Sequence, residues 1–240
     1  MTSLFISDLH LMQEREDVTV AFERFVREVP QAGDTLYVLG DLFEYWAGDD
    51  DIEAPFNQRV TAVFAQCAGR GITQYFMHGN RDFVAGAAFA DRARLTLLQD
   101  PHPLQLEGVA SVLLHGDTLC TDDHEYQAFR AKARSPQWQQ AMLSQPLAAR
   151  KMAIEQMRRQ SEAQKAVKAV DIMDVNEGAV RQVFADTRAV RMIHGHTHRP
   201  GRHEYDVNGV RCERWVLPPW EQEPGYLRVA PDACQLIDFK

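Results

Sequence analysis

Short runs of apolar residues alternate with longer amphipathic stretches along the first third of the chain. Three of these runs are too short for helices and are typical of buried strands: residues 4–7, 35–39 and 72–77. The stretch between the first two runs has apolar residues at helical spacing over 22–29 and ends at Pro30. This β-α-β-α-β order predicts a parallel sheet with right-handed crossovers and helices packed on it.

Hairpin signals replace this alternation later in the chain. Asn208-Gly209 is the strongest of them, because this dipeptide favours the two-residue turn that joins antiparallel strands. We expect hairpins that pair 104–106 with 110–114, 205–207 with 210–216, and 226–229 with 234–239, and a further strand at 189–193. The second half is therefore predicted to be antiparallel. Together with the first half, it predicts an α/β (α+β) fold of two packed mixed sheets with outer helices.

Residues 122–170 contain no strand signal and are rich in Ala, Gln, Arg and Lys. Pro136 and Pro146 divide this stretch, so we expect a helical insertion of two or more segments. The chain of 240 residues is long enough for one large core. We therefore expect a single domain over 1–240 with a helical insertion at about 122–170.

Five of the predicted strands end in side chains of the kinds that bind metal ions. They are Asp8 with His10, Asp41, Asn80, His115, and His196 with His198. The carboxyl ends of strands line the ligand crevice in open α/β folds, so these groups can meet although they are far apart in sequence. One such turn is weak evidence for a site. Five turns together have a single explanation if they form one site.

The densest of these turns is 194–198, where three histidines fall within five residues. Alternate side chains of an extended segment share a face, and Gly195 permits a sharp turn. Carboxylate, amide and imidazole ligands without thiolate suit Mn, Mg or Fe. Two such ions about 3.5–4 Å apart, bridged by Asp41, would polarise a phosphoryl group, and Arg81 would hold its oxygens. The alternative is a surface loop that happens to contain histidines.

Charge and cysteine usage restrict the class of partner and the compartment. The net charge of −8 argues against general nucleic-acid binding. Residues 130–168 nevertheless carry nine Lys or Arg against two Glu, a balance of +7 on a remainder of −15, which indicates a local anionic partner such as a phosphate or a lipid headgroup. The four cysteines form no C-x-x-C pair, no secretion signal is evident, and no apolar run approaches the ~20 residues of a membrane span. These features predict free thiols and a cytoplasmic protein.

Five motifs, in their order along the chain, resemble those of the calcineurin-like metallophosphoesterases. They are Asp8-Leu9-His10, Gly40-Asp41, Gly79-Asn80-Arg81-Asp82, His115-Gly116-Asp117 and Gly195-His196-Thr197-His198. Within this superfamily, Arg81, where many members carry His, and the blocks 115–123 and 194–200 resemble the members that hydrolyse UDP-2,3-diacylglucosamine in Gram-negative lipid A synthesis. The resemblance covers nearly the whole chain. It implies a four-layer αββα sandwich in which the helical insertion forms a lid.

The resemblance also implies a reaction, a cofactor and a location. A metal-bound hydroxide would attack the α-phosphorus of UDP-2,3-diacylglucosamine to give UMP and 2,3-diacylglucosamine 1-phosphate (lipid X). The enzyme would use two Mn2+ ions per chain and lie peripherally on the cytoplasmic face of the inner membrane. The implied ligands are Asp8, His10, Asp41 and His198 for one ion, and Asp41, Asn80, His115 and His196 for the other. The implied substrate contacts are Asn80, Arg81, Asp123, Ser161, Lys165, Lys168 and His196, with catalytic roles for Asp41, Asn80, Arg81 and His115.

Two departures from the family pattern accompany this resemblance. The position of Lys165 is variable in the family, although Ser161, Lys165 and Lys168 have the helical spacing that lets all three face one way. Residues 217–220 read Leu-Pro-Pro-Trp, where relatives usually have Gly and often Asp before the Trp. This second departure affects the local loop but no metal ligand.

Several residues have simpler interpretations than a role in catalysis. His194 is expected to be structural, the acidic run 49–51 to be a solvated loop, and Asp117 and Asp122 to be caps or turn formers. The apolar residues of the insertion either pack it onto the body or form a cleft for acyl chains, with its basic face directed to anionic lipid. They are Trp138, Met142, Leu143, Leu147, Met152, Ile154 and Met157.

Rival functions remain at this point. One is a phosphodiesterase or phosphatase that acts on a soluble nucleotide or phosphoprotein. Such an enzyme would not require the insertion at 122–170. The other is a metal-free scaffold, which would have lost ligands that this chain retains. A nuclease is disfavoured by the −15 balance of the body.

Overall fold

The structure is a computed structural model that describes residues 1–165, 174–221 and 223–239, and of 160–165 only the backbone. It contains two sheets. In spatial order, the first consists of β11 (Ala233–Asp238), β10 (Gly225–Ala230), β1 (Ser3–Ile6), β2 (Thr35–Leu39), β3 (Thr73–Met77) and β4 (Thr96–Leu98). The second consists of β5 (His102–Leu106), β6 (Val109–Leu113), β7 (Arg191–His194), β9 (Val210–Val216) and β8 (Gly201–Val207).

Both sheets are mixed, as the sequence predicts. Strands β1 to β4 are parallel, and the hairpin β10–β11 joins antiparallel to β1. In the second sheet β7 lies between β6 and β9 and is parallel to both, while β5 and β8 form antiparallel edges. The prediction of an antiparallel second half is therefore wrong for β7. Hairpin signals report only pairings between neighbours in sequence, and both partners of β7 are reached through longer connections.

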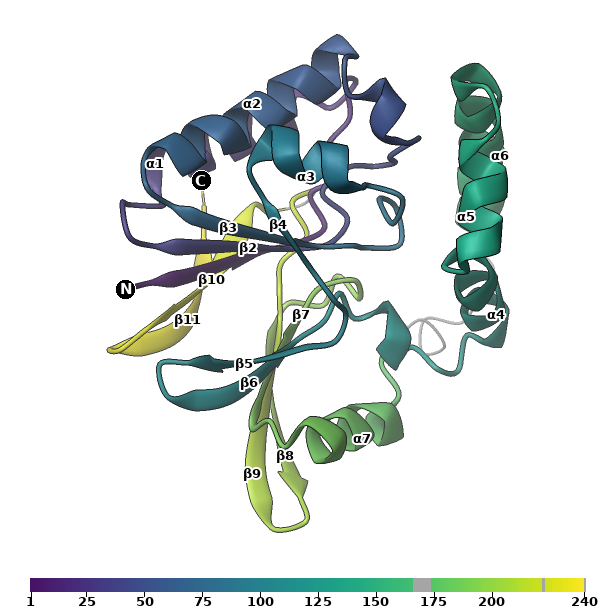
Figure 1. Cartoon of the computed structure of the whole chain (residues 1–240). Helices are drawn as coiled ribbons and strands as arrows, with labels where there is room; N and C mark the ends of the chain where they lie inside the picture. Colours follow the sequence, from purple (N-terminus) through teal and green to yellow (C-terminus); the bar gives the residue numbers. More distant parts are fainter. Residues whose placement is uncertain (166–173, 222, 240) are drawn as a thin grey trace.

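Helices lie outside the two sheets in the arrangement that makes four layers (Figure 1). On the outer side of the first sheet are α1 (Glu16–Glu28), α2 (Pro55–Gly69) and α3 (Ala87–Ala93), and α7 (Glu177–Thr187) packs on the second sheet. Two short 3-10 helices, η1 (Asp49–Asp51) and η2 (Asp117–Leu119), follow strand-end loops. Asn176 begins α7 by accepting hydrogen bonds from the backbone N–H groups of Gly178 and Ala179.

Three clusters of buried side chains fill the three interfaces between these layers. Because successive residues of a strand point to opposite faces, Leu4 and Ile6 of β1 pack under α1 and α2, whereas Phe5 packs between the sheets. Leu113 and Ile193 meet Phe5 in this middle layer from the second sheet. The third cluster joins that sheet to α7. The four-layer αββα sandwich is thus confirmed.

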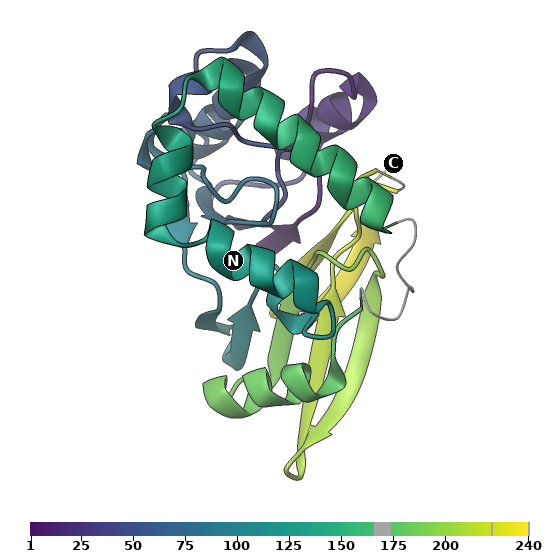
Figure 2. The ribbon, with the colours of Figure 1, turned by 90° about the vertical axis from the view of Figure 1, so that its right-hand side faces the viewer.

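The predicted insertion forms three helices, α4 (His124–Ala133), α5 (Pro136–Leu143) and α6 (Leu147–Lys165), which we call the lid. Figure 2 shows that the lid crosses the side of the molecule where strands of both sheets end. Pro136 begins α5, and Pro146 lies directly before α6. The assignment of 1–240 to a single domain stays a prediction. Within the described residues, no helix is both long enough and apolar enough to cross a bilayer.

Candidate metal centre and active site

Strand-end loops carry the predicted ligands in an unusual backbone conformation. Asp8, His10, Asp41, His196 and His198 have φ of 54°, 49°, 52°, 69° and 54°. This left-handed region is unfavourable for residues with a side chain, and such strain is concentrated at functional sites. The loops are therefore held in place by their surroundings rather than by local preference.

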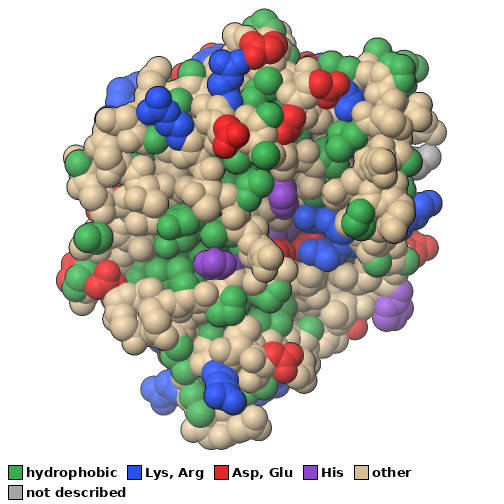
Figure 3. Space-filling view, in the orientation of Figure 1, with side chains coloured by type: hydrophobic (Ala, Val, Ile, Leu, Met, Phe, Trp, Pro, Cys, Tyr) green, Lys and Arg blue, Asp and Glu red, His purple; other side chains and the backbone are tan. Residues whose placement is uncertain are grey.

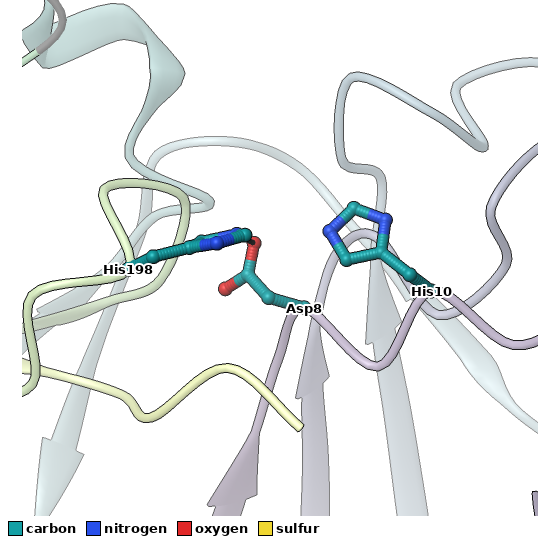
Figure 4. Close-up of side chains that lie close together, drawn as sticks. All are labelled: Asp8, His10 and His198. Atoms are coloured by element: carbon teal, nitrogen blue, oxygen red, sulfur yellow. Dashed lines mark ion pairs between the residues drawn. The ribbon is translucent and has the colours of Figure 1, made fainter. Parts of the chain in front are cut away.

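The first group consists of Asp8, His10 and His198, with one ligand atom from each within 4.8 Å of the others. In Figure 4 the carboxylate of Asp8 lies between the two imidazoles. Asp8 Oδ2 accepts hydrogen bonds from Ser7 Oγ at 2.6 Å and His196 N at 2.9 Å. Asp8 Oδ1 is buried, has no hydrogen-bond partner among the described residues, and faces His198 Nε2 at 3.4 Å. One oxygen thus orients the carboxylate and the other is available for a cation.

The second group consists of Asp41, His115 and His196, again with ligand atoms within 4.8 Å. His115 Nδ1 donates to the carbonyl of Leu39 at 2.9 Å, which directs Nε2 into the group. Asn80 Oδ1 lies 3.0 Å from this Nε2. A ring nitrogen and an amide oxygen that converge in this way are suitable ligands for one ion.

Asp41 lies between the two groups. Its Oδ1 accepts a hydrogen bond from the backbone N–H of Arg81 at 2.8 Å. Its Oδ2 is 3.8 Å from His10 Nε2 and 3.8 Å from His115 Nε2, so one oxygen faces both groups. This is the position that a bridging carboxylate requires.

Burial and charge together indicate that this centre needs cations. Burial lowers the pKa of His115, but the carboxylates of Asp41, Asp117 and Asp8 outweigh it and raise the pKa to about 9. Burial raises the pKa of Asp8, yet the neighbouring histidines bring it well below its usual range. Without a cation, the buried carboxylates therefore favour protons on His10 and His115, which a divalent ion would replace, whereas burial, followed by the charge of His115, lowers the pKa of His196 to about 4 and leaves that ring neutral. The donor set of oxygen and nitrogen without thiolate fits Mn, Mg or Fe.

A cavity of about 320 Å³ lies between the metal centre and the lid. Its charged and amide side chains are Asn80, Arg81 and Glu44 of the body and Glu125 and Arg158 of the lid, and Arg81 Nε is buried without a hydrogen-bond partner among the described residues. The remaining lining includes aromatic and aliphatic side chains from the body and from all three lid helices, namely Trp46, Phe83, Val84, Tyr126, Phe129, Met142, Ile154 and Met157. Figure 3, in the orientation of Figure 1, shows histidine and basic side chains at a hollow in the middle of the molecular surface.

The other predicted site residues have different outcomes. Asp123 caps α4 by accepting from Tyr126 N at 3.1 Å, and it is absent from the lining of the cavity. Ser161 and Lys165 lie on α6, but their side chains are outside the described part of the chain, as is the whole of Lys168. Their contacts with substrate stay predictions.

His194 is structural, as expected. Its Nδ1 donates to the carbonyl of Gly195 at 2.8 Å, and its Nε2 is 3.1 Å from the guanidinium of Arg214. Both ring nitrogens are therefore occupied. Burial, followed by the charge of Arg214, lowers the pKa of His194 to about 3, so the ring is neutral and accepts from Arg214.

The interpretation of 49–51 as a solvated loop is wrong. Asp49 accepts from Gly86 N at 2.9 Å and Phe89 N at 3.1 Å, which caps the start of α3. Asp50 pairs with Arg150 of α6, and Asp51 Oδ1 lies 2.7 Å from Lys151 Nζ. A charge run in sequence does not reveal that a distant basic helix packs against it.

Glu44 was not singled out from the sequence, and Asp117 was expected only to be a cap or turn former. Glu44, three residues after Asp41, is buried beside His10. Burial alone would raise its pKa, but His10, Arg81 and Arg158 outweigh burial and lower the pKa of Glu44 to about 2. Asp117 is more than a turn former, because it accepts from Tyr126 Oη at 2.6 Å and Arg130 Nε at 2.7 Å of α4. The sequence signal that could have identified Glu44 is its position three residues after Asp41, in the same loop.

Comparison with known proteins agrees with this geometry. Residues 1–200 match the family model described as calcineurin-like phosphoesterase. The chain belongs to the calcineurin-like phosphoesterase family. It is also similar to UDP-2,3-diacylglucosamine hydrolase of Aromatoleum aromaticum, with 49% identity over 95% of this chain and 93% of the relative. Proteins of the same name from Klebsiella pneumoniae subsp. pneumoniae and Salmonella typhi are each 43% identical over 100% of this chain and 99% of the relative.

Proposed function

We propose that this protein hydrolyses the pyrophosphate bond of UDP-2,3-diacylglucosamine at the α-phosphorus and releases UMP and 2,3-diacylglucosamine 1-phosphate. The observation that carries the proposal is an apolar cavity, built partly by the lid, that opens onto Asn80 and Arg81 beside the two ligand groups. A substrate with both a pyrophosphate and acyl chains matches a cavity that is lined by both charged and apolar side chains. Relatives that carry this substrate in their name are similar over nearly the full chain.

The metal centre in this proposal holds two Mn2+ ions. Asp8, His10, Asp41 and His198 would bind one, and Asp41, Asn80, His115 and His196 the other. Bound ions supply Lewis-acid polarisation of the phosphoryl group and lower the pKa of water. Manganese is the expected ion, while the donor set also accepts magnesium or iron.

The chain's own residues bind and orient the substrate in this proposal. Arg81 lines the cavity, where the planar fork of its guanidinium can hold two phosphate oxygens and offset charge that develops on them. Its backbone N–H holds Asp41 at 2.8 Å, so one residue links the phosphate contact to the bridging carboxylate. The lid side chains of Met142, Ile154 and Met157 exclude water from the apolar part of the cavity.

The test is UMP release from UDP-2,3-diacylglucosamine in detergent, with Mn2+, with Mg2+ and with a chelator. A UDP-sugar without acyl chains and a generic phosphodiester serve as comparison substrates. Mn2+-dependent release from the acylated substrate alone is expected. Cleavage of only the generic ester would retain the metal centre and reassign the substrate to a soluble compound.

Replacement of Asp41 tests the bridging role directly. Asp41→Asn should lower turnover by more than about 100-fold, because even residues that only support a metal ligand cost 10–100-fold. Metal content should fall as well. Asp186→Asn, an exposed change on α7, is the control and should retain both. Full activity of Asp41→Asn with two ions bound would contradict the bridging role.

We also propose that the lid contacts the cytoplasmic face of the inner membrane. Phe129, Leu143 and Met152 of the lid are exposed apolar side chains, and Arg159, on the same helix as Met152, is 77% exposed. Arg150, Lys151 and Arg158 are unsuitable for a test by charge reversal, because they pair with Asp50, Asp51 and Glu44 of the body. A variant that combines Met152→Glu with Arg159→Glu should co-sediment less with anionic vesicles, while its turnover in detergent should stay unchanged. Co-sedimentation equal to that of the wild type would contradict this membrane contact.

A further inference from the structure

Glu44 lies between the metal centre and the lid, although it belongs to neither ligand group. It is in the loop after β2, its backbone N–H donates to the carbonyl of Leu11 at 3.1 Å, and its side chain is 8% exposed. Glu44 Oε2 is 2.9 Å from His10 Nδ1. Glu44 Oε1 is 2.8 Å from Arg158 Nε and 2.7 Å from Arg158 Nη2. The two oxygens of one carboxylate thus contact a predicted metal ligand and the lid.

The contact with His10 orients a ligand. The contact between Glu44 Oε2 and Nδ1 is a close ion-pair contact rather than an aligned hydrogen bond, and a carboxylate at this distance favours the proton on Nδ1, which leaves the lone pair on Nε2, the nitrogen that faces Asp41. This Nε2 is the atom that lies 3.8 Å from Asp41 Oδ2. The position of Glu44 therefore determines whether His10 presents a lone pair to a cation.

The contact with Arg158 connects the same carboxylate to α6. Arg158 is 22% exposed, and its guanidinium also lies 5.8 Å from the ring centroid of Tyr45. Among the described residues, the other cation near Glu44 Oε1 is Arg81, whose Nη1 is 3.7 Å away, beyond hydrogen-bond distance. If α6 left this position, the buried carboxylate would lose the guanidinium that fixes Oε1, so Oε2 would be held less firmly at His10 Nδ1 and would orient that ring less well.

We propose that Glu44 is a positioning residue that couples the docking of lid helix α6 to metal binding at the group of Asp8, His10 and His198. Coupling between two sites is reciprocal, so docking of α6 raises metal affinity and metal binding stabilises the docked helix. The proposal rests on the metal-ligand roles given under the proposed function and not on the identity of the substrate.

Metal affinity provides the first test. Chelator-treated protein is titrated with Mn2+ by calorimetry, and the two binding steps are resolved. Glu44→Gln presents an amide that can act as a donor toward His10, and it should weaken one step by about 10-fold. Arg158→Ala should weaken the same step by about threefold, and the double variant should bind no more weakly than Glu44→Gln alone. Arg158→Lys should recover part of the loss.

Arg159→Ala is the matched control. Arg159 is the next residue on α6, carries the same charge, and pairs with Glu155 of its own helix. Its removal should leave both Mn2+ affinities unchanged. Thermal melts identify any variant that fails to fold, and Arg158→Ala carries the test if Glu44→Gln does not fold.

Hydrogen exchange of α6 provides the reciprocal readout. Mn2+ should slow exchange of the α6 backbone around Arg158 in the wild-type protein and in Arg159→Ala, but not in Glu44→Gln. Wild-type Mn2+ affinity in Arg158→Ala, or α6 exchange that is indifferent to Mn2+, would overturn the coupling. Neither readout uses a substrate. Failure to hydrolyse UDP-2,3-diacylglucosamine would therefore contradict the proposed function but not the coupling between α6 and metal binding.

Discussion

Gly195 shows how a single residue without a side chain determines the geometry of the metal centre. A Cβ at this position would lie 2.1 Å from Asp8 Oδ2 and 2.2 Å from Ser7 Oγ. Gly195→Ala should therefore displace Asp8, and a displacement of about 1 Å at a reacting centre costs about 100-fold in rate. Turnover and Mn2+ stoichiometry measure the effect.

Gly69→Ala is the control for this change. Nothing lies within 4 Å of a Cβ at Gly69, which is in α2. This variant should retain activity, metal content and stability. A Gly195→Ala protein with normal turnover would show that the loop can move by the distance needed without disturbing Asp8.

Asp100 gives a prediction for the pH dependence of stability. Burial, followed by the charge of Asp117, raises the pKa of Asp100 to about 6 from its usual value of 3.8. The nearest guanidinium nitrogen, Arg130 Nη2, is 3.7 Å away and forms no hydrogen bond. The folded state therefore binds a proton more tightly than the unfolded state does. This contribution to stability is complete below pH 3.8 and is lost as the pH rises through about 6.

Asp100→Asn removes this titration while preserving the shape of the side chain. Relative to the wild type, its free energy of unfolding should rise between about pH 4 and pH 7 by at most about 3 kcal/mol, from two pKa units at 1.36 kcal/mol each. Urea denaturation of chelator-treated protein across this range is the measurement. Asp186→Asn is the surface control. A difference between Asp100→Asn and wild type that does not vary with pH would contradict the assignment.

At the scale of elements, the sequence predicts what depends on neighbours in the chain. The apolar runs that became β1, β2 and β3 are buried on both faces, and such strands are recognisable as short continuous runs. The turn at Asn208 and Gly209 joins β8 and β9 as predicted. The edge strand β4 and the short helix α3 were missed, because three and seven residues give too little periodicity.

The lid is the element whose role depends most on distant contacts. Its helical nature follows from composition, but its packing depends on pairs such as Arg150 with Asp50 and Arg158 with Glu44, each separated by 100 residues or more. Neither member of such a pair is distinctive in sequence. The +7 balance therefore indicated a basic surface, whereas much of that charge pairs with the body.

The proposed acyl role of the lid can be tested by filling the cavity. Met157 of α6 lines it, so Met157→Trp should occupy space that acyl chains need. The preference for UDP-2,3-diacylglucosamine over a UDP-sugar without acyl chains should fall by at least about 10-fold, mainly through KM for the acylated substrate. Met152→Trp, on the same helix but 73% exposed and absent from the cavity lining, is the control. An unchanged preference in Met157→Trp would place the acyl chains elsewhere.

At the scale of the whole molecule, the metal centre joins the two sheets. Asp8, His10 and Asp41 follow strands of the first sheet, whereas His115, His196 and His198 follow strands of the second. Each ligand group therefore contains residues from both sheets. The sequence could predict that these strand ends meet, but not which sheet supplies each ligand, because that depends on the pairing of β7 with β6 and β9.

This arrangement predicts that metal ions stabilise the entire fold. An ion that binds only the folded state at 100 times its Kd adds about 2.7 kcal/mol, which corresponds to about 5–10 °C in Tm for a domain of this size. Tm of chelator-treated protein should therefore rise by at least this amount on addition of Mn2+. Asp41→Asn weakens the only ligand that faces both groups among the described residues, so its Tm should respond much less. An equal rise in the variant and the wild type would mean that the ions bind without linking the sheets through Asp41.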